Sequence, residues 1–289
     1  MRYGLVLPNF GPLADTRELI TLARAADRSG WDGFFLTDTI QMDGTETFPA
    51  SDPWIDLAAI ATGTERIRIG LLVTGVPRYR PWQLARQAVT LDHLSNGRLI
   101  LGVGSGDPHD RGFSAFGEEL NPRRRAELLD ESLEIIQGLW RGTPFRYRGK
   151  HFTVDEITLL PTPRQSPRIP IWVGWTWPNP RPMRRAARWD GAVPFTIADD
   201  GSYADLTPAD IRELGEFLRD HRDAEAPYDI VTYGSALAAL DVEEARATIR
   251  DYADAGATWT VEFIDPGVDP RELRAAIERG VPTIVGTTV

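Results

Sequence analysis

Short apolar runs rich in β-branched and aromatic residues alternate along the whole chain with longer segments of helical periodicity, and this alternation restricts the fold more than any other feature. It is typical of repeated strand–helix units around a parallel sheet. Eight of the runs are predicted to be strands, at residues 2–7, 33–37, 67–73, 98–103, 169–174, 191–195, 229–234 and 258–264.

Eight strands that alternate with helices close most economically as a (β/α)8 TIM barrel of the α/β class. An open doubly wound sheet is the alternative, but it usually has fewer strands and a glycine-rich turn after the first one. The first predicted strand is followed instead by Pro8, Asn9, Phe10 and Gly11. We therefore predict a single barrel domain over residues 1–289, with an insertion at about residues 142–168 before the fifth strand. The centre of that insertion, residues 147–151, suggests a small hairpin.

Charge and cysteine content exclude several classes of function. The formal net charge of -10 disfavours nucleic acid and anionic membrane surfaces as partners, because both attract clustered Lys and Arg. The chain has no cysteine, so thiolate metal sites and cysteine nucleophiles are excluded and any redox chemistry must come from a bound cofactor. We find neither a signal peptide nor an apolar stretch of the roughly 20 residues that span a bilayer, and we expect a cytoplasmic protein.

Active sites of such barrels lie at the C-terminal ends of the strands, so the residues that follow each predicted strand are the site candidates. These residues are Asn9 after the first strand, Asp38 after the second, Thr74, Gly75 and Val76 after the third, Gly104, Ser105, Gly106, Asp107 and His109 after the fourth, and Trp175, Thr176 and Trp177 after the fifth.

Hydrolytic chemistry has weak support among these residues. Metal-assisted hydrolysis needs converging histidines and carboxylates, but the four histidines are scattered and only His109 follows a strand. Glycoside hydrolysis needs a pair of carboxylates, for which Asp38, Asp107 and Glu262 are candidates at a separation that the sequence leaves open. A barrel hydrolase remains a minor alternative.

Glycine, small hydroxyls and aromatics dominate the strand ends, and this favours a planar ring that brings its own chemistry. Gly75 and the run from Gly102 to Gly106 would let the backbone approach such a ring closely. Thr176 precedes a predicted helix with Pro178 near its first turn, an arrangement suited to a cofactor phosphate, with Arg181, Arg184 and Arg185 adding positive charge.

The chain resembles the luciferase-like monooxygenase superfamily of flavin- and deazaflavin-dependent barrel oxidoreductases. The resemblance covers nearly the whole chain, and it is carried by ordered motifs at residues 80–92, 94–106, 129–131, 139–142, 147–152, 170–174 and 185–191.

The resemblance implies that FMN or coenzyme F420 is the cofactor. It implies that residues 74–76 form a bulge behind the flavin ring, often with a non-proline cis peptide, that Ser105 and Gly106 lie near the ring, and that residues 174–177 hold the phosphate. Many relatives have a second glycine where this chain has Trp175, so the phosphate loop is expected to differ. Sugar dehydrogenases of the superfamily have histidine and glutamate where this chain has Thr39 and Ser105, so sugars are not expected as substrates.

We therefore predict a flavin-dependent oxidoreductase that acts on a small organic substrate, either by hydride transfer or by monooxygenation. Cofactor contacts are predicted at Asn9, residues 74–76, 104–106 and 174–177, and proton handling at Asp38, Asp107 and His109. The resemblance also implies a homodimer and, for reduced flavin, a flavin reductase as a possible partner. A flavin-binding carrier without turnover is the alternative from another class.

Overall fold

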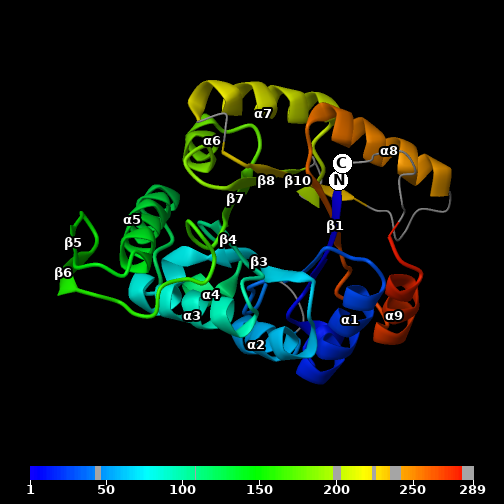
Figure 1. The fold of residues 1–289 in the computed structure, drawn as a ribbon, viewed down its shortest axis with the longest axis horizontal. Coiled ribbons are helices and arrows are strands. Elements are labelled where there is room, and N and C mark those ends of the chain that lie inside the picture. The colour runs from blue at the N-terminus through cyan, green and yellow to red at the C-terminus, as the bar shows by residue number, and fades with distance from the viewer. Residues whose placement is uncertain (43–46, 108, 198–202, 223–225, 235–241, 282–289) are drawn as a thin grey trace.

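Eight parallel strands close into a barrel in the computed structural model, which describes residues 1–42, 47–107, 109–197, 203–222, 226–234 and 242–281 (Figure 1). Neighbouring strands pair in chain order, and the pairing of β8 with β10 closes the ring. The predicted fold is confirmed, and every predicted strand is present with ends that differ by at most two residues. The strands are β1 (Arg2–Leu7), β2 (Gly33–Leu36), β3 (Arg68–Gly75), β4 (Leu99–Gly104), β7 (Ile171–Thr176), β8 (Gly191–Ile197), β10 (Asp229–Gly234) and β11 (Trp259–Phe263).

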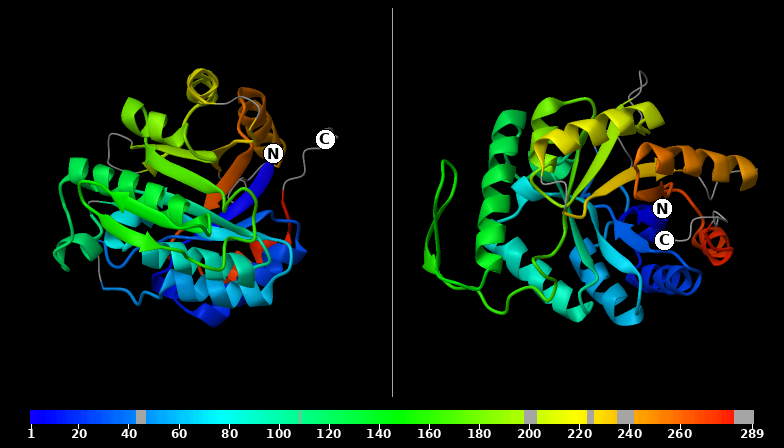
Figure 2. Two further views of the ribbon diagram at one scale, coloured as in Figure 1. Left: turned by 60° about the vertical axis from the view of Figure 1, so that its left-hand side comes forward. Right: turned by 45° about the horizontal axis from the view of Figure 1, so that its top comes forward.

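Helices surround the barrel and bury their apolar faces against it (Figures 1 and 2). Several begin with a capping side chain followed by proline, which is pre-organised for the first helical position; Asp52, Thr207 and Asp269 are such caps, as their sequence predicted. The helices are α1 (Thr16–Arg28), α2 (Pro53–Gly63), α3 (Pro81–Leu94), α4 (Arg111–Ser114), α5 (Pro122–Trp140), α6 (Pro180–Ala186), α7 (Pro208–His221), α8 (Val242–Ala255) and α9 (Pro270–Glu278), with short 3-10 turns η1 (Gly11–Leu13) and η2 (Val76–Arg78).

Large aromatic side chains fill the inside of the barrel. Phe35, Trp172 and Trp259 meet there with ring centroids 5.2 to 6.0 Å apart. A side chain on Gly191 would collide with the Trp172 indole, so glycine on the neighbouring strand makes room for these rings. The barrel is therefore solid through its middle, and a ligand has access only to its ends.

The insertion before β7 forms the predicted hairpin, which lies outside α5 and away from the barrel (Figures 1 and 2). Its strands are β5 (Phe145–Arg148) and β6 (Thr153–Ile157). The Glu131 carboxylate on α5 accepts hydrogen bonds from the backbone N–H groups of Lys150, His151 and Phe152 and so holds the turn against the helix. One further short strand, β9 (Tyr203–Ala204), pairs antiparallel with β8.

Several of the motifs that carry the resemblance contain residues that join neighbouring elements by hydrogen bonds. Asp130 of α5 binds Arg185 of α6 through two hydrogen bonds of 2.6 and 2.9 Å. The Trp140 indole N–H donates to the carbonyl of Ala85 on α3. The buried Arg98 guanidinium donates to backbone carbonyls of three neighbouring segments. These residues of the motifs therefore specify how the helices pack on the barrel.

Candidate active site

Glycines line the C-terminal end of the barrel at three neighbouring strands, β3, β4 and β7. We call Gly75, Gly104, Gly106 and Gly174, with Val73 among them, the glycine seat. A Cβ atom on Gly104 or Gly174 would stand 2.9 Å from one or the other methyl group of Val73. The Val73 side chain, half-buried at the barrel mouth, therefore forms a small apolar platform. Any side chain at position 104 or 174 would cover this platform, so glycine is needed at both positions.

The bulge that was predicted at residues 74–76 of β3 is present, but it lies at Leu72 and Val73. The register of β3 against β4 shifts between Leu71 and Thr74, and the peptide between Leu72 and Val73 is cis. Thr74 has already rejoined the ladder opposite Val103, whose side chain packs in the core outside the barrel. Paired residues of a sheet share a face, so the Thr74 side chain points away from the mouth and only its backbone borders the seat. Val76 belongs to η2 and packs in the same outer core.

Arg125 is a buried arginine beside the glycine seat that the sequence analysis missed. Arg125 is 4% exposed, and its Nε and Nη1 atoms have no hydrogen-bond partner among the residues that the structure describes. Its guanidinium lies 4.9 Å from the ring centroid of Phe113, the ring that a side chain on Gly106 would strike. Burial lowers the pKa of Arg125, and the carboxylates of Asp107 and Glu119 oppose this effect. A buried cation with two nitrogen atoms that lack hydrogen-bond acceptors is suited to hold an anionic ligand group.

The helical pattern of the chain contained a signal for this residue. Arg125 lies four residues before Leu129 and eight before Leu133, on the apolar face of α5 that packs against the barrel. An arginine on such a face is unusual unless its charge is paired. The apparent run of three surface arginines, residues 123–125, concealed it.

The segment after β7 differs from its prediction. Helix α6 begins at Pro180 with Asn179 as its cap, two residues later than expected, and Trp177–Pro178 is a cis peptide that precedes it. The side chains of Trp175 and Trp177 are buried in the core outside the barrel, and the Trp177 indole donates to Asp210. Arg185 is engaged by Asp130. Only Thr176, which is exposed, and the backbone of this segment face the mouth.

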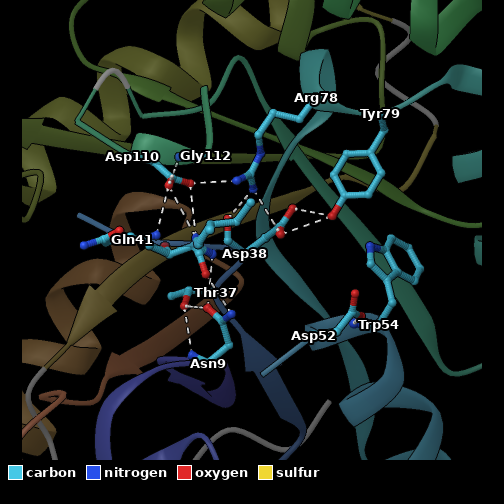
Figure 3. Close-up of polar contacts among 12 residues, drawn as sticks. Asn9, Thr37, Asp38, Gln41, Asp52, Trp54, Arg78, Tyr79, Asp110 and Gly112 are labelled. Atoms are coloured by element: carbon cyan, nitrogen blue, oxygen red, sulfur yellow. Dashed lines mark hydrogen bonds and ion pairs between the residues drawn. The ribbon is translucent and has the colours of Figure 1, made fainter. Parts of the chain in front are cut away.

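Asn9 has a supporting position. Its side-chain N–H groups donate to the carbonyls of Thr39 and Ser51, and its amide oxygen accepts from the Thr37 hydroxyl and the Thr39 N–H (Figure 3). All of its amide capacity is thus used to hold the loop after β2. Asn9 therefore positions this loop, and it also lines the cavity described below; its predicted contact with a cofactor stays a prediction.

Asp38 lies in a buried polar cluster with Arg78, Tyr79 and Asp110 (Figure 3). The Arg78 guanidinium stands between the two carboxylates, 3.1 Å from Asp38 and 2.8 Å from Asp110. The Tyr79 hydroxyl is 3.0 Å from one Asp38 oxygen and 3.1 Å from the other. Burial raises the pKa of Asp38, while Arg78, Tyr79 and a backbone hydrogen bond from Gly75 lower it. The hydrogen bond from Gly75 links this cluster directly to the glycine seat.

The other predicted proton carriers are more open. The Asp107 carboxylate is half-buried and accepts a hydrogen bond from the backbone of His109. The His109 side chain is exposed, and Ser105, which lies between the seat glycines Gly104 and Gly106, is half-buried. Asp110, which the sequence analysis did not single out, is the buried carboxylate of this loop and caps α4 through Gly112.

A cavity of about 420 Å³ opens beside this cluster. Asp38, Arg78 and Tyr79 contribute polar groups to its wall, and Ile40 and Phe116 contribute apolar ones. No group of histidines and carboxylates among the described residues is arranged to bind a metal ion. In the same part of the chain, none of the helices combines the length and the apolar character of a membrane span.

Comparison with known proteins gives a consistent picture. The family model described as luciferase-like monooxygenase matches residues 1–280. An F420-dependent glucose-6-phosphate dehydrogenase of Nakamurella multipartita is 34% identical over 72% of this chain and 59% of its own length. The oxygenase component of a flavin-dependent trigonelline monooxygenase from Acinetobacter baylyi is 31% identical over 56% of this chain and 44% of its own. This chain thus spans about half the length of these curated relatives.

Solved structures with a similar fold are also known. The monooxygenase RslO1 from Streptomyces bottropensis superposes with a TM-score of 0.76 over 96% of both chains, at 21% sequence identity. At that identity the likeness concerns the barrel architecture alone.

Proposed function

Because this chain belongs to the luciferase-like monooxygenase family, we propose that it is an oxidoreductase that holds FMN or coenzyme F420 at the C-terminal mouth of its barrel. Its substrate in this proposal is a small organic molecule. The observation that carries the proposal is the pair of unpartnered N–H groups on buried Arg125, beside a seat that is kept open by glycines.

The residues at the mouth fit a flavin-type group. Val73 and the glycines of β4 and β7 offer an apolar platform of the kind that a ring can lie on. Arg125 is placed to pair with an anionic tail, and the residue after it, Ala126, is bonded to Arg185 of α6, the helix that follows Thr176. A cofactor phosphate between Arg125 and the backbone after β7 would therefore accept hydrogen bonds from Nε and Nη1, which have no acceptor among the described residues.

A flavin-type group bound here supplies two-electron redox chemistry. The chain itself orients the ring through the seat, excludes water through Phe113 and its neighbours, and places a proton-carrying carboxyl, Asp38, next to Gly75. Hydride transfer and monooxygenation both remain within this proposal, since the two relatives named above use F420 and flavin respectively. Thr39 and Ser105 argue against a sugar substrate.

Titration of the purified protein with FMN and with F420, followed by absorbance, tests the proposal. We expect one of them to bind, and Arg125→Gln to weaken binding by about tenfold to a hundredfold, because a charged hydrogen bond of roughly 1.5 to 3 kcal/mol is lost. Arg124→Gln is the matched control, since Arg124 is the neighbouring arginine with a 66% exposed side chain. Failure of both cofactors to bind the wild-type protein would end the proposal.

Turnover distinguishes an enzyme from a carrier. A catalytic protein accelerates the oxidation of the reduced cofactor by oxygen or by an organic acceptor, whereas a carrier leaves that rate unchanged. A hydrolase would instead act on its substrate after the cofactor has been removed.

The proposal also includes a protein partner, an oligomeric state and a cellular location. The relative that is an oxygenase component supports a flavin reductase as partner if FMN is the cofactor. Exposed Ile55 on α2 and Trp82 on α3, two helices that pack side by side, support a homodimer. We propose a cytoplasmic location on the composition alone. Sedimentation analysis and a pull-down with a flavin reductase test the first two points.

A further inference from the structure

The cavity of about 420 Å³ adjoins the glycine seat, but none of the seat residues lines it. Its wall comes from the ends of β1 and β2, from residues 50–53 at the start of α2, from η2 and from the segment around α4. Ile40 is 46% exposed and Phe116 is 69% exposed, so the outer part of the wall is apolar. The inner part is polar and ends at Asp38 and Tyr79. The cavity thus suits a small molecule with an apolar body and one polar end.

Tyr79 and Asp38 form a connected pair at the polar end (Figure 3). The phenol donates its proton to the Asp38 carboxylate at 3.0 Å, and its oxygen, which the Trp54 indole N–H also faces, keeps a second lone pair that can accept a proton or a hydrogen bond from a ligand. Burial and the Asp38 charge raise the pKa of Tyr79, so the phenol stays protonated. The Trp54 indole lies on the other side of the phenol (Figure 3).

The surroundings of Asp38 prepare it to exchange a proton. Burial raises its pKa, and Arg78, which is shared with Asp110, limits that rise. Asp110 acts in the opposite sense to Arg78. Arg78, which pairs with Asp38, lies against Gly75, since a Cβ on that glycine would stand 3.3 Å from the Arg78 Nε atom, so the carboxyl lies close to the seat on which a cofactor ring would lie. A proton on the substrate therefore has a continuous route, through the phenol oxygen of Tyr79 to the carboxylate of Asp38.

We propose that Tyr79, paired with Asp38, is the residue that accepts or delivers the proton on the reacting oxygen of a hydroxyl- or carbonyl-bearing substrate in this cavity, an assignment that rests on the proposed function. In the oxidising direction a bound oxidised flavin or F420 would be the acceptor for the hydride that leaves the substrate carbon. The substrate O–H proton passes to the Tyr79 oxygen while the phenol proton passes to Asp38. The products are a carbonyl compound, the reduced cofactor and a protonated Asp38. In the reducing direction each transfer is reversed.

Binding of a simple alcohol to the cofactor-free protein gives the first test. In protein labelled with 13C at the tyrosine ζ carbon, the Tyr79 signal is identified by its absence in Tyr79→Phe. Cyclohexanol is expected to shift this signal, because its hydroxyl donates to the phenol oxygen. Methoxycyclohexane, which has no hydroxyl proton, is expected to leave the signal in place. A Tyr79 signal that cyclohexanol does not move up to its solubility limit overturns the proposal.

Single-turnover kinetics with cofactor and an alcohol or ketone found by screening give the second test. Tyr79→Phe is expected to slow the chemical step by about a hundredfold or more, as general acid–base catalysis predicts, and to remove its solvent deuterium isotope effect. Its affinity for the cofactor should not change. The matched control is Tyr147→Phe on the distant hairpin, which loses a comparable hydrogen bond of 3.0 Å to Glu134 of α5.

The two proposals fail in different ways. If Tyr79→Phe binds the cofactor and turns over like the wild-type protein, the assignment of Tyr79 is wrong and the proposed function stands. If the wild-type protein binds neither FMN nor F420, the proposed function is wrong, and the cyclohexanol titration still decides whether Tyr79 contacts a hydroxyl ligand.

Discussion

The phenyl ring of Phe113 occupies the space into which a side chain on Gly106 would project. Gly106 has φ +84°, a conformation that side chains with a Cβ rarely adopt. The same ring is flanked by the guanidiniums of Arg78 and Arg125, whose central carbons lie 5.2 and 4.9 Å from its centroid. Phe113 therefore connects the glycine seat to the cation that we propose for the cofactor and to the cation that holds Asp38.

Replacement of Gly106 by alanine should damage both stability and cofactor binding. The positive φ costs about 1 kcal/mol or more in a residue with a Cβ, and the overlap with Phe113 adds about 1 to 3 kcal/mol. We expect the free energy of unfolding, measured by urea denaturation, to fall by their sum. Cofactor affinity should fall as well, because Phe113 moves and carries Arg125 with it.

Gly117→Ala separates the two costs. Gly117 has φ +72°, but a Cβ there would meet nothing within 4 Å. This variant should therefore show the backbone cost alone and bind cofactor normally. Equal losses in the two variants would contradict the packing role of Phe113.

The fold could be predicted from the sequence because the signal is repeated. Each strand is a short apolar run, and its helix begins at a recognisable cap such as Asp52 or Asp269. Eight repetitions compensate for uncertainty in any single one. The bulge at Leu72–Val73 lay outside this signal, since backbone geometry within an apolar run leaves no mark on the pattern.

The site was predicted only in part, because its residues meet through the tertiary structure. The glycines after β4 were visible in the sequence, but the pairing of Tyr79 with Asp38 joins positions 41 residues apart. Asn9 follows a strand as a ligand-binding residue would, yet the loop after β2 uses all of its hydrogen bonds. A position at the end of a strand thus identified candidate site residues, but their roles depend on hydrogen-bond partners that only the tertiary structure shows.

Asp205 should give the protein a measurable pH dependence. Although Asp205 as a residue is exposed, its carboxyl is partly desolvated, and this raises the pKa of the carboxyl from 3.8 to about 6. Between these values the unfolded chain has lost the proton while the folded protein keeps it, so raising the pH favours the unfolded state. The stabilising effect is therefore complete below pH 3.8 and is lost as the pH rises to about 6.

Asp205→Asn, which stays neutral at every pH, isolates this effect. Urea denaturation at a series of pH values should show the wild-type protein losing stability relative to the variant between about pH 4 and 6, with no further change above. Parallel stability curves for the two proteins across this range would show that the Asp205 carboxyl titrates normally.

Arg98 should be essential for stability and irrelevant to the chemistry, because it lies just before β4, at the end of the barrel opposite the mouth. Its side chain makes five hydrogen bonds of 2.7 to 3.0 Å, to the Thr64 hydroxyl and to the carbonyls of Ala61, Thr64, Ile67 and Ser95. Lysine cannot reproduce this planar set of donors. We expect Arg98→Lys to lose about 3 to 5 kcal/mol of unfolding free energy, since buried carbonyls are left without donors.

The matched control for Arg98→Lys is Arg86→Lys, on the exposed face of α3, where a surface substitution should change stability by less than about 0.5 kcal/mol. Both variants should bind the cofactor with wild-type affinity when measured well below their melting temperatures. A stable Arg98→Lys protein would mean that water can replace the arginine as donor to these carbonyls. A stable fold with weakened cofactor binding would mean that the two ends of β4 are coupled, because packing shifts at its start would then reach the glycines of the seat.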